Sequence, residues 1–192
     1  MGSLLSLLLP VLGLLAGTVA SLPARAADIP AAQQALLLLK VLAYDKQLDE
    51  RIREGRLAIL HRTGHTESEA CGRDLMAALE EATSSFEVSG HRLTAGVFAV
   101  ASNEAVEEAI AAGPVAVYLC PGIEEQLDSI LAASAAHDAL TFTAQTSFID
   151  AGTSIGLVLE GDRPRMVVNL TTSREEGARL SASLLAVSDV RR

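Results

Sequence analysis

The pattern of apolar and polar positions in the last quarter of the chain predicts a β-hairpin. Two apolar runs, 155–159 and 166–170, flank the polar link 160–165. Runs of this length with a short link that contains glycine are typical of antiparallel neighbours, so we expect the chain to turn at Gly161-Asp162.

A helix is predicted directly after this hairpin. A hydroxyl among residues 171–173 can accept a hydrogen bond from the first unpaired N–H groups of a helix, and Leu180, Leu184 and Val187 recur on one helical face. The segment has no histidine, cysteine or glycine-rich phosphate loop, so it predicts structure and no chemistry.

The middle of the chain alternates between strand and helix patterns. Strands are predicted at 56–63, 91–101, 115–119 and 139–144, and helices at 66–85, 102–113 and 124–136. Thr66 and Glu69 have the spacing of a capping box, and Ser102 or Asn103 can cap the next helix.

An additional helix is predicted before the first strand, over residues 29–52. Leu37, Val41, Tyr44 and Leu48 fall on one face at three- and four-residue spacing. Further leucines widen this face, so the helix is either deeply packed or covers a partner, and we favour core packing.

Together these elements predict an α/β fold with three layers, α/β/α. Parallel neighbours need crossovers, and the intervening helices supply them. We expect a mostly parallel, flavodoxin-like sheet in which the first and third strands are adjacent, completed by the C-terminal antiparallel hairpin and a terminal helix.

The beginning of the chain predicts export. Residues 4–22 are strongly apolar but are interrupted by Pro10, Gly13 and Gly17, and Ala24-Arg25-Ala26 fits a signal-peptide cleavage site. The alternative, a membrane anchor, requires about 20 unbroken apolar residues. We therefore expect a signal peptide at 1–26, a single domain at 27–192, and a soluble periplasmic protein with no stable membrane anchor after cleavage.

The charge of the chain argues against polyanionic partners. Its net charge is −9, and removal of residues 1–26 takes away one arginine and no acid, which leaves 14 basic against 24 acidic residues, or −10. Such a charge disfavours nucleic acid and anionic membrane surfaces.

The junction after the first predicted strand is where a dinucleotide-binding domain carries its glycine fingerprint. Residues 63–67 contain one glycine, and Glu67 and Glu69 stand at the helix N-terminus. These carboxylates would repel a pyrophosphate, so we expect no dinucleotide and no other cofactor.

His61, His65, Glu67, Glu69 and Cys71 form the one cluster with metal-ligand residue types. His61 is predicted in a strand and His65 in a loop, so their four-residue spacing does not give a shared helical face, and we favour ordinary histidines over a zinc site.

A catalytic nucleophile is equally hard to assemble from this sequence. No serine lies in a glycine-flanked strand-to-helix elbow, and Ser181, Ser183 and Ser188 belong to the predicted final helix. His91 and His137 stand alone, and a hydrolase that uses His61 or His65 is our third and least favoured hypothesis. We expect no catalytic residues.

Cys71 and Cys120 are the only two cysteines in the sequence, and an even number in an exported chain favours a disulfide. Cys71 falls in the first turns of the helix after the first strand, and Cys120 ends the third strand. Adjacent strands would bring both sulfurs to one edge of the sheet. The alternative is one buried and one free thiol.

Residues 152–190 carry a closing pattern: a glycine lead, a strand pair that ends in Asn-Leu, and a helix with recurrent Gly, Ser and Leu. The residues of this pattern are Gly152, Ile155, Val158, Asn169, Leu170, Gly177, Leu180, Ser181, Ser183, Leu184, Leu185 and Val190. They resemble the end of the YfiR-like family of exported proteins. The strand–helix alternation fits the family in order, and the motif residues are expected to be structural.

The resemblance implies a function. Known members are periplasmic repressors that bind the periplasmic sensory domain of a membrane diguanylate cyclase and lower cyclic di-GMP output. The chain departs from the family at its first helix, where Tyr44 is the lone aromatic residue and Asp45-Lys46 replaces the usual Trp-Pro. This protein could therefore have a different partner from that of the known members, or none of that kind.

Two functions follow from these observations. The first is a non-enzymatic periplasmic regulator that binds the periplasmic sensory domain of an inner-membrane cyclase or sensor kinase and represses it. Redox control through Cys71 and Cys120 is left open. Whether the protein forms a homodimer is also left open. The alternative is a small-molecule-binding module that resembles one lobe of a periplasmic substrate-binding protein, with its ligand at the carboxyl ends of the strands.

Overall fold

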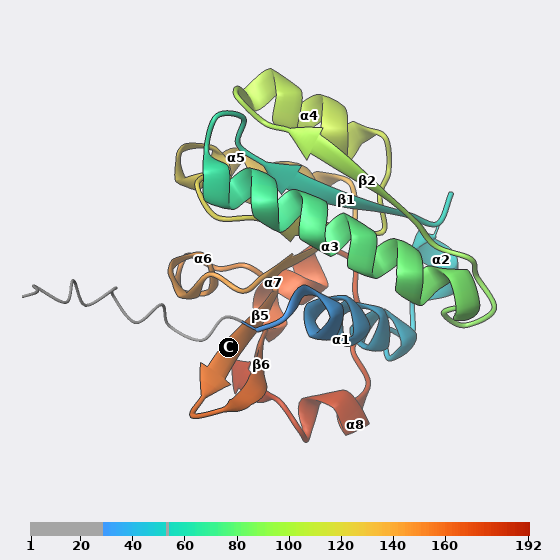
Figure 1. Ribbon diagram of the computed structural model, residues 1–192. Helices are drawn as coiled ribbons and strands as arrows, with labels where there is room; N and C mark the ends of the chain where they lie inside the picture. Colours follow the sequence, from blue (N-terminus) through green and yellow to red (C-terminus); the bar gives the residue numbers. More distant parts are fainter. Residues whose placement is uncertain (1–28, 53) are drawn as a thin grey trace, which may run out of the picture.

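A computed structural model describes residues 29–52 and 54–192, and the predicted signal peptide lies outside this part of the chain. One sheet runs through the molecule (Figure 1). It has seven strands in the order β2-β1-β3-β4-β5-β6-β7. The strands are β1 (Arg56–His61), β2 (Thr94–Ala99), β3 (Ala116–Leu119), β4 (Leu140–Thr143), β5 (Ile155–Glu160), β6 (Arg163–Asn169) and β7 (Asp189–Arg191). Strands β1 to β5 are parallel, which confirms the predicted fold class and the adjacency of the first and third strands.

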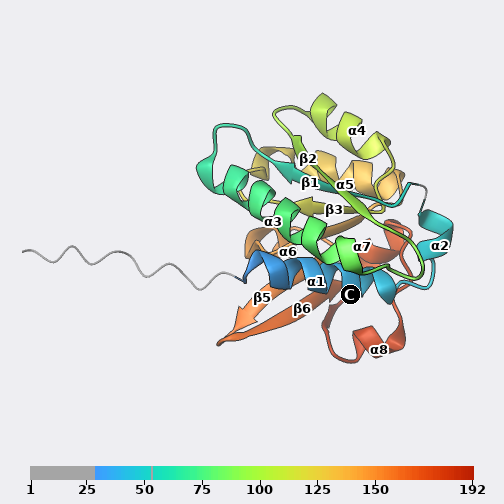
Figure 2. The ribbon, with the colours of Figure 1, turned by 45° about the vertical axis from the view of Figure 1, so that its right-hand side comes forward.

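Helices cover both faces of this sheet (Figure 2). They are α1 (Ala31–Ala43), α2 (Leu48–Arg51), α3 (Thr66–Ser85), α4 (Asn103–Ala111), α5 (Leu127–Ala136), α6 (Thr146–Asp150), α7 (Leu170–Glu175), α8 (Ala182–Leu185) and the 3-10 turn η1 (Glu124–Gln126). Residues of α1 and α3 pack on one face and those of α4 and α5 on the other, each with its own apolar cluster. The result is the predicted three-layer arrangement.

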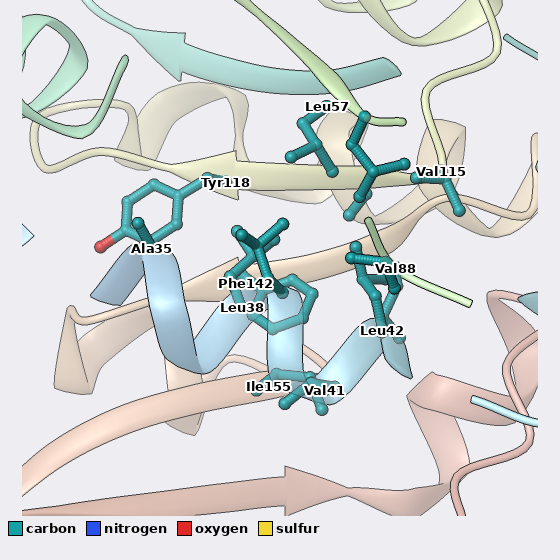
Figure 3. Packing of buried hydrophobic residues seen from close by; sticks show 14 of the residues in the cluster. Ala35, Leu38, Val41, Leu42, Leu57, Val88, Val115, Tyr118, Phe142 and Ile155 are labelled. Atoms are coloured by element: carbon teal, nitrogen blue, oxygen red, sulfur yellow. The ribbon is translucent and has the colours of Figure 1, made fainter. Parts of the chain in front are cut away.

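The strands β3 and β4 are buried along their whole length, as expected for parallel strands covered on both faces. Alternate side chains point to opposite faces: Tyr118 and Phe142 pack towards α1, whereas Val117 and Leu119 pack towards α5. Figure 3 shows the first of these clusters, where Leu38 and Leu42 of α1 lie against the sheet.

The predicted first helix is shorter than expected, and its buried face is partly different. α1 ends at Ala43, because the chain turns at Asp45, whose backbone pairs with Leu180, and it resumes as α2. Val41 is buried as predicted, but Leu37 is half-buried and Tyr44 is exposed. The inward face is instead formed by Ala35, Leu38, Leu39, Val41 and Leu42.

The predicted hairpin is confirmed, and it belongs to the main sheet. β5 and β6 pair antiparallel from Ile155 opposite Val168 to Glu160 opposite Arg163, so the chain turns at Gly161-Asp162. β5 joins β4 in parallel over only two residue pairs, which begin at Phe142 opposite Ile155.

The predicted continuous terminal helix is wrong. The segment forms two short helices, α7 and α8, and then a seventh strand, β7, parallel to β6. Asn169 caps α7 by accepting a hydrogen bond from the Thr172 N–H at 3.2 Å, in place of the predicted hydroxyls at 171–173. Gly177 ends the helical path because its φ of +76° is left-handed, and the N–H of Ser181 then donates to the carbonyl of Tyr44.

The helix α3 begins as predicted but is capped differently. The N-cap is His65, whose Nδ1 accepts from the Ser68 N–H at 3.2 Å, whereas Glu69 accepts from the Gly64 N–H at 2.8 Å. The capping box of Thr66 and Glu69 is therefore not formed. The predicted cap of the next helix is correct, because the Ser102 hydroxyl accepts from the Ala105 N–H.

Candidate functional site

A groove of about 710 Å³ opens at the carboxyl ends of the parallel strands. It lies between the start of α1, the first half of α3, the loop from β4 to α6 and the outer part of β5. Its apolar lining includes Ile29, Pro30, Ala70, Leu75, Tyr118, Pro121, Ala144, Leu157, Val158 and Leu159. Open α/β sheets bind ligands at this edge, near the point where the connections that follow two neighbouring strands lead to opposite sides.

The polar lining of this groove is acidic or neutral. Glu67 and Asp74 come from α3, and the uncharged groups are Gln34, Gln145, Thr146 and Ser147. Within the described residues that line it, there is no lysine or arginine. Such a surface suits a neutral or cationic group and disfavours a phosphate.

Tyr118 and Gln34 fix the start of α1 against the floor of the groove. The Tyr118 hydroxyl donates to the Gln34 side-chain oxygen, and Gln34 Nε2 donates to the carbonyl of Ile29 at 2.6 Å. Burial raises the pKa of Tyr118, so its hydroxyl stays protonated and acts as the donor. The groove wall formed by α1 is therefore tied to β3.

The structure joins Cys71 of α3 to Cys120, the residue after β3, in a disulfide with a Cα–Cα separation of 5.9 Å. This agrees with the predicted pairing and with the adjacency of β1 and β3. Cys71 also lines the groove. Nearby, Gly122 packs against the His65 ring, where an added Cβ would lie 2.9 Å from an imidazole atom.

The two histidines of the candidate metal cluster, His61 and His65, have different contacts in the structure. His61 ends β1 with its Nδ1 buried and unpartnered within the described part of the chain, His65 caps α3, and Cys71 is in the disulfide. Across residues 29–52 and 54–192, no three His, Cys, Asp or Glu side chains lie close enough together to hold a metal ion.

The isolated histidines form surface contacts. His91 Nε2 lies 2.9 Å from Asp49 Oδ1, and His137 Nε2 lies 3.1 Å from Glu107 Oε1. These pairs are exposed and separate from the groove.

The matched motif residues lie around the break between α7 and α8. Asn169 Nδ2 donates to the Gly152 carbonyl at 3.4 Å and so links the lead glycine to the end of β6. Ser181 caps α8 at the Leu184 N–H and lies 2.9 Å from Ser183 Oγ, while Ser188 donates to the Leu184 carbonyl. Leu180 and Leu184 are buried, and Leu170 and Leu185 are half-buried.

Sequence reasoning missed a buried carboxyl group, Glu176, which follows α7. Its oxygens accept from the Thr141 N–H at 2.8 Å, the Thr141 hydroxyl at 2.7 Å and the Ser154 hydroxyl. The β4–β5 ladder begins only at Phe142, so Glu176 satisfies the N–H group that no strand partner reaches.

The surroundings of Glu176 change its acidity. Burial raises its pKa to about 7, although the hydrogen bonds from Ser154 and Thr141 and the charge of Arg51 act in the opposite direction. Adjacent glutamates, Glu175 and Glu176, give no periodic signal that would single out the second one.

A second buried polar contact was also missed. The Asp45 carboxylate pairs with the Arg51 guanidinium and accepts from the N–H groups of Gln47 and Arg179 at 3.0 and 2.8 Å. Arg51 also donates to the carbonyls of Val115 and Asp138, each at 2.8 Å. This contact connects α2, the amino ends of β3 and β4, and the segment between α7 and α8.

The outer side of α1, together with Tyr44 directly after it, presents two large apolar side chains and two polar ones to solvent. Gln33, Leu36, Lys40 and Tyr44 recur at three- and four-residue spacing, and all four are exposed; we call them the α1 face. Leu36 is 60% exposed and Tyr44 37%. α8 adjoins the end of this helix through Tyr44 and Ser181, and it is followed by Val187, which is 78% exposed.

None of the helices in the described part of the chain is both long enough and apolar enough to cross a membrane. No curated protein matches the sequence.

Several solved structures have a fold similar to that of this chain. An ABC domain from Streptococcus pneumonia in complex with L-Trp has a TM-score of 0.61 at 14% identity, over 84% of this chain and 61% of that one. A conserved domain protein from Vibrio cholerae gives 0.61 at 14%, over 86% and 62%. The open, ligand-free substrate-binding protein CD0873 from Clostridium difficile gives 0.60 at 9%, over 85% and 60%. This chain spans about three fifths of each.

The family comparison covers nearly the whole sheet. The model of the YfiR/HmsC-like family matches residues 56–189, from the start of β1 to the start of β7. Its members are periplasmic regulators and are not known as enzymes. The chain therefore belongs to the YfiR/HmsC-like family, as its closing motif predicted.

Proposed function

We propose that this protein is a non-enzymatic periplasmic regulator that binds the periplasmic sensory domain of an inner-membrane diguanylate cyclase or sensor kinase and represses it. The observation that carries the proposal is the family match, which extends over residues 56–189. It is supported by His65 and Ser181, which cap helices, and by His91 and His137, which form surface pairs, whereas His61 lies apart from them at the end of β1.

We propose that the α1 face contacts the partner. Large exposed apolar side chains on one side of an element are typical of interaction surfaces. Leu36 in α1 and Tyr44, its C-cap residue, both face solvent, and the buried side of the same helix packs on the sheet, so the surface is preformed. Lys40 between them supplies a positive charge on a chain whose net charge is −9.

Co-purification tests this proposal. The tagged wild-type protein, incubated with solubilised inner membranes of its host, should retain a protein that has a periplasmic domain and a cytoplasmic cyclase or kinase domain. Leu36→Asp should abolish retention because it places a charge in the apolar contact, while Phe86→Asp, at an equally apolar exposed site after α3, should retain the partner.

Circular dichroism of each variant excludes unfolding as the cause. Retention that is equal for Leu36→Asp and the wild type would contradict the role of the α1 face, and recovery of no such membrane protein would contradict the function.

A second candidate function is binding of a small molecule in the groove. The acidic and apolar lining favours a neutral or cationic ligand with an apolar body. A similar fold is seen in a complex with L-Trp, which makes amino acids and amines the first compounds to screen.

Thermal-shift measurement separates the two functions, since a ligand that binds only the native state stabilises it by about 2.7 kcal/mol at a hundredfold excess over Kd. A compound that raises the melting temperature of the wild type but not of Asp74→Asn would support this function. A flat response across neutral and cationic compounds would contradict it.

A further inference from the structure

The first half of α3 presents two carboxylates to the groove. Glu67 and Asp74 are seven residues apart, so they lie on one side of the helix with about 10 Å between their Cα atoms. The α3 residues between them that line the groove are Ala70 and Cys71, whose small side chains leave the space along the helix open. The two carboxylates therefore mark the ends of one continuous strip of the groove wall.

Both carboxylates are accessible to a ligand. The two residues are exposed, and Asp74 takes part in one exposed ion pair, in which Arg73 Nε lies 3.4 Å from Asp74 Oδ1. An exposed ion pair contributes little free energy, so a ligand can replace it at small cost. Arg73 does not line the groove, and neither does any other arginine or lysine among the described residues. A cation that enters the groove therefore meets only negative or neutral groups.

The other walls of the groove supply uncharged oxygens and apolar surface. Gln145, Thr146 and Ser147 follow β4, and Leu157 and Leu159 belong to β5. The oxygens can accept hydrogen bonds from N–H groups, and the leucines can contact alkyl carbons. A carboxylate on the ligand would find no cationic side chain in this lining. The groove therefore favours an amine without a carboxylate over an amino acid.

We propose that the groove binds a linear polyamine, whose outer ammonium groups pair with Glu67 and Asp74 and whose alkyl chain follows Ala70 and Cys71. This inference rests on the second candidate function, the binding of a small molecule in the groove, and it specifies the class of ligand. The ammonium groups of a polyamine repel each other and keep the chain extended, which suits two separated carboxylates. The net charge of −9 also attracts a polycation at long range.

Isothermal titration calorimetry with the triamine spermidine tests the two carboxylates. The wild type should bind spermidine in a 1:1 complex that weakens as salt is raised. Glu67→Gln and Asp74→Asn should each raise the dissociation constant about 10-fold, because each removes a charge-assisted hydrogen bond. Glu80→Gln removes an exposed carboxylate of the same helix outside the groove and should leave the dissociation constant nearly unchanged.

The length of the amine tests the spacing. The shorter diamine putrescine cannot reach both carboxylates as easily, so it should bind the wild type more weakly than spermidine does. This difference should shrink in Asp74→Asn, where one carboxylate of the pair is missing. Equal dissociation constants for the wild type and both groove variants would overturn the proposal. An equal loss in Glu80→Gln would also overturn it, because it would show unspecific attraction to an acidic protein.

Thermal-shift measurement on the same proteins separates the failure of this inference from the failure of the groove function. If spermidine has no effect but a neutral compound or L-tryptophan raises the melting temperature of the wild type, the groove function stands and the polyamine assignment is wrong. If none of these compounds binds, both are contradicted.

Discussion

Replacement of the buried Glu176 by glutamine should change how stability depends on pH. The wild-type carboxyl group has a pKa of about 7 in the folded state against an ordinary value of 4.5. Below pH 4.5 it is neutral in both folded and unfolded chains. Between 4.5 and 7 the unfolded chain has lost a proton that the folded chain retains, so the free energy of unfolding falls as pH rises.

The size of this effect follows from the same two values. At ~1.36 kcal/mol per unit of pKa, the difference amounts to about 3 kcal/mol between pH 4.5 and pH 7, with little further change above it. Glutamine can replace the neutral carboxyl group: its oxygen can accept from the Thr141 N–H and the Ser154 hydroxyl, and its amide can donate to the Thr141 hydroxyl.

Urea unfolding followed by far-UV circular dichroism, from pH 4.5 to 8, measures this contribution. Relative to the wild type, Glu176→Gln should gain about 3 kcal/mol of unfolding free energy across the interval. Glu175→Gln changes the adjacent exposed carboxylate and should leave the pH profile unaltered. Parallel profiles for wild type and Glu176→Gln would refute the assignment of a buried, neutral Glu176.

Three further predictions concern the contacts that hold the elements together. Reduction of the Cys71–Cys120 disulfide, or Cys71→Ala with Cys120→Ala, should lower the free energy of unfolding by about 4 kcal/mol, because the bond closes a 49-residue separation; an unchanged urea midpoint with dithiothreitol would contradict this. Gly177→Ala should destabilise more than Gly161→Ala. Both glycines have left-handed φ values, but only at Gly177 does an added Cβ meet a side chain, Asp138 Oδ1 at 2.7 Å, and equal melting temperatures would exclude that contact. Asp45→Ala should cost about 3–5 kcal/mol by leaving the Arg51 charge buried without its partner, and a loss below 1 kcal/mol in urea unfolding would show that Arg51 reaches solvent.

The sheet could be predicted from the sequence because its signals are local. The apolar run ending at Leu119 and the two runs around Gly161-Asp162 each define a strand without reference to distant residues, and strand–helix alternation defines the parallel order. The same order placed Cys71 and Cys120 at one edge, which is why their pairing could be anticipated.

The terminal segment could not be predicted because distant contacts decide it. The spacing of Leu180, Leu184 and Val187 is helical, yet the backbone between α7 and α8 pairs with residues near Asp45, more than 130 positions earlier in the chain. The family pattern places Gly177 within the closing helix, although its left-handed conformation ends the helical path here.

The buried polar groups escaped sequence reasoning for a related reason. Glu176 compensates for the late start of the β4–β5 ladder, a property of strand register that no residue pattern records.

Tyr44 fits an apolar stripe in the sequence, but it lies outside the helix because the helix ends at Ala43. The sequence left open that this helix covers a partner, but only the structure identifies the residues of the α1 face.

The central claim, repression of a membrane signalling protein, is tested most directly by cyclic di-GMP in the host cell. Deletion of this protein should raise the cyclic di-GMP content, expression of the wild type should restore it, and Leu36→Asp, at equal abundance in the periplasm, should fail to do so. An unchanged content on deletion, or full restoration by Leu36→Asp, would contradict a cyclase regulator that acts through the α1 face.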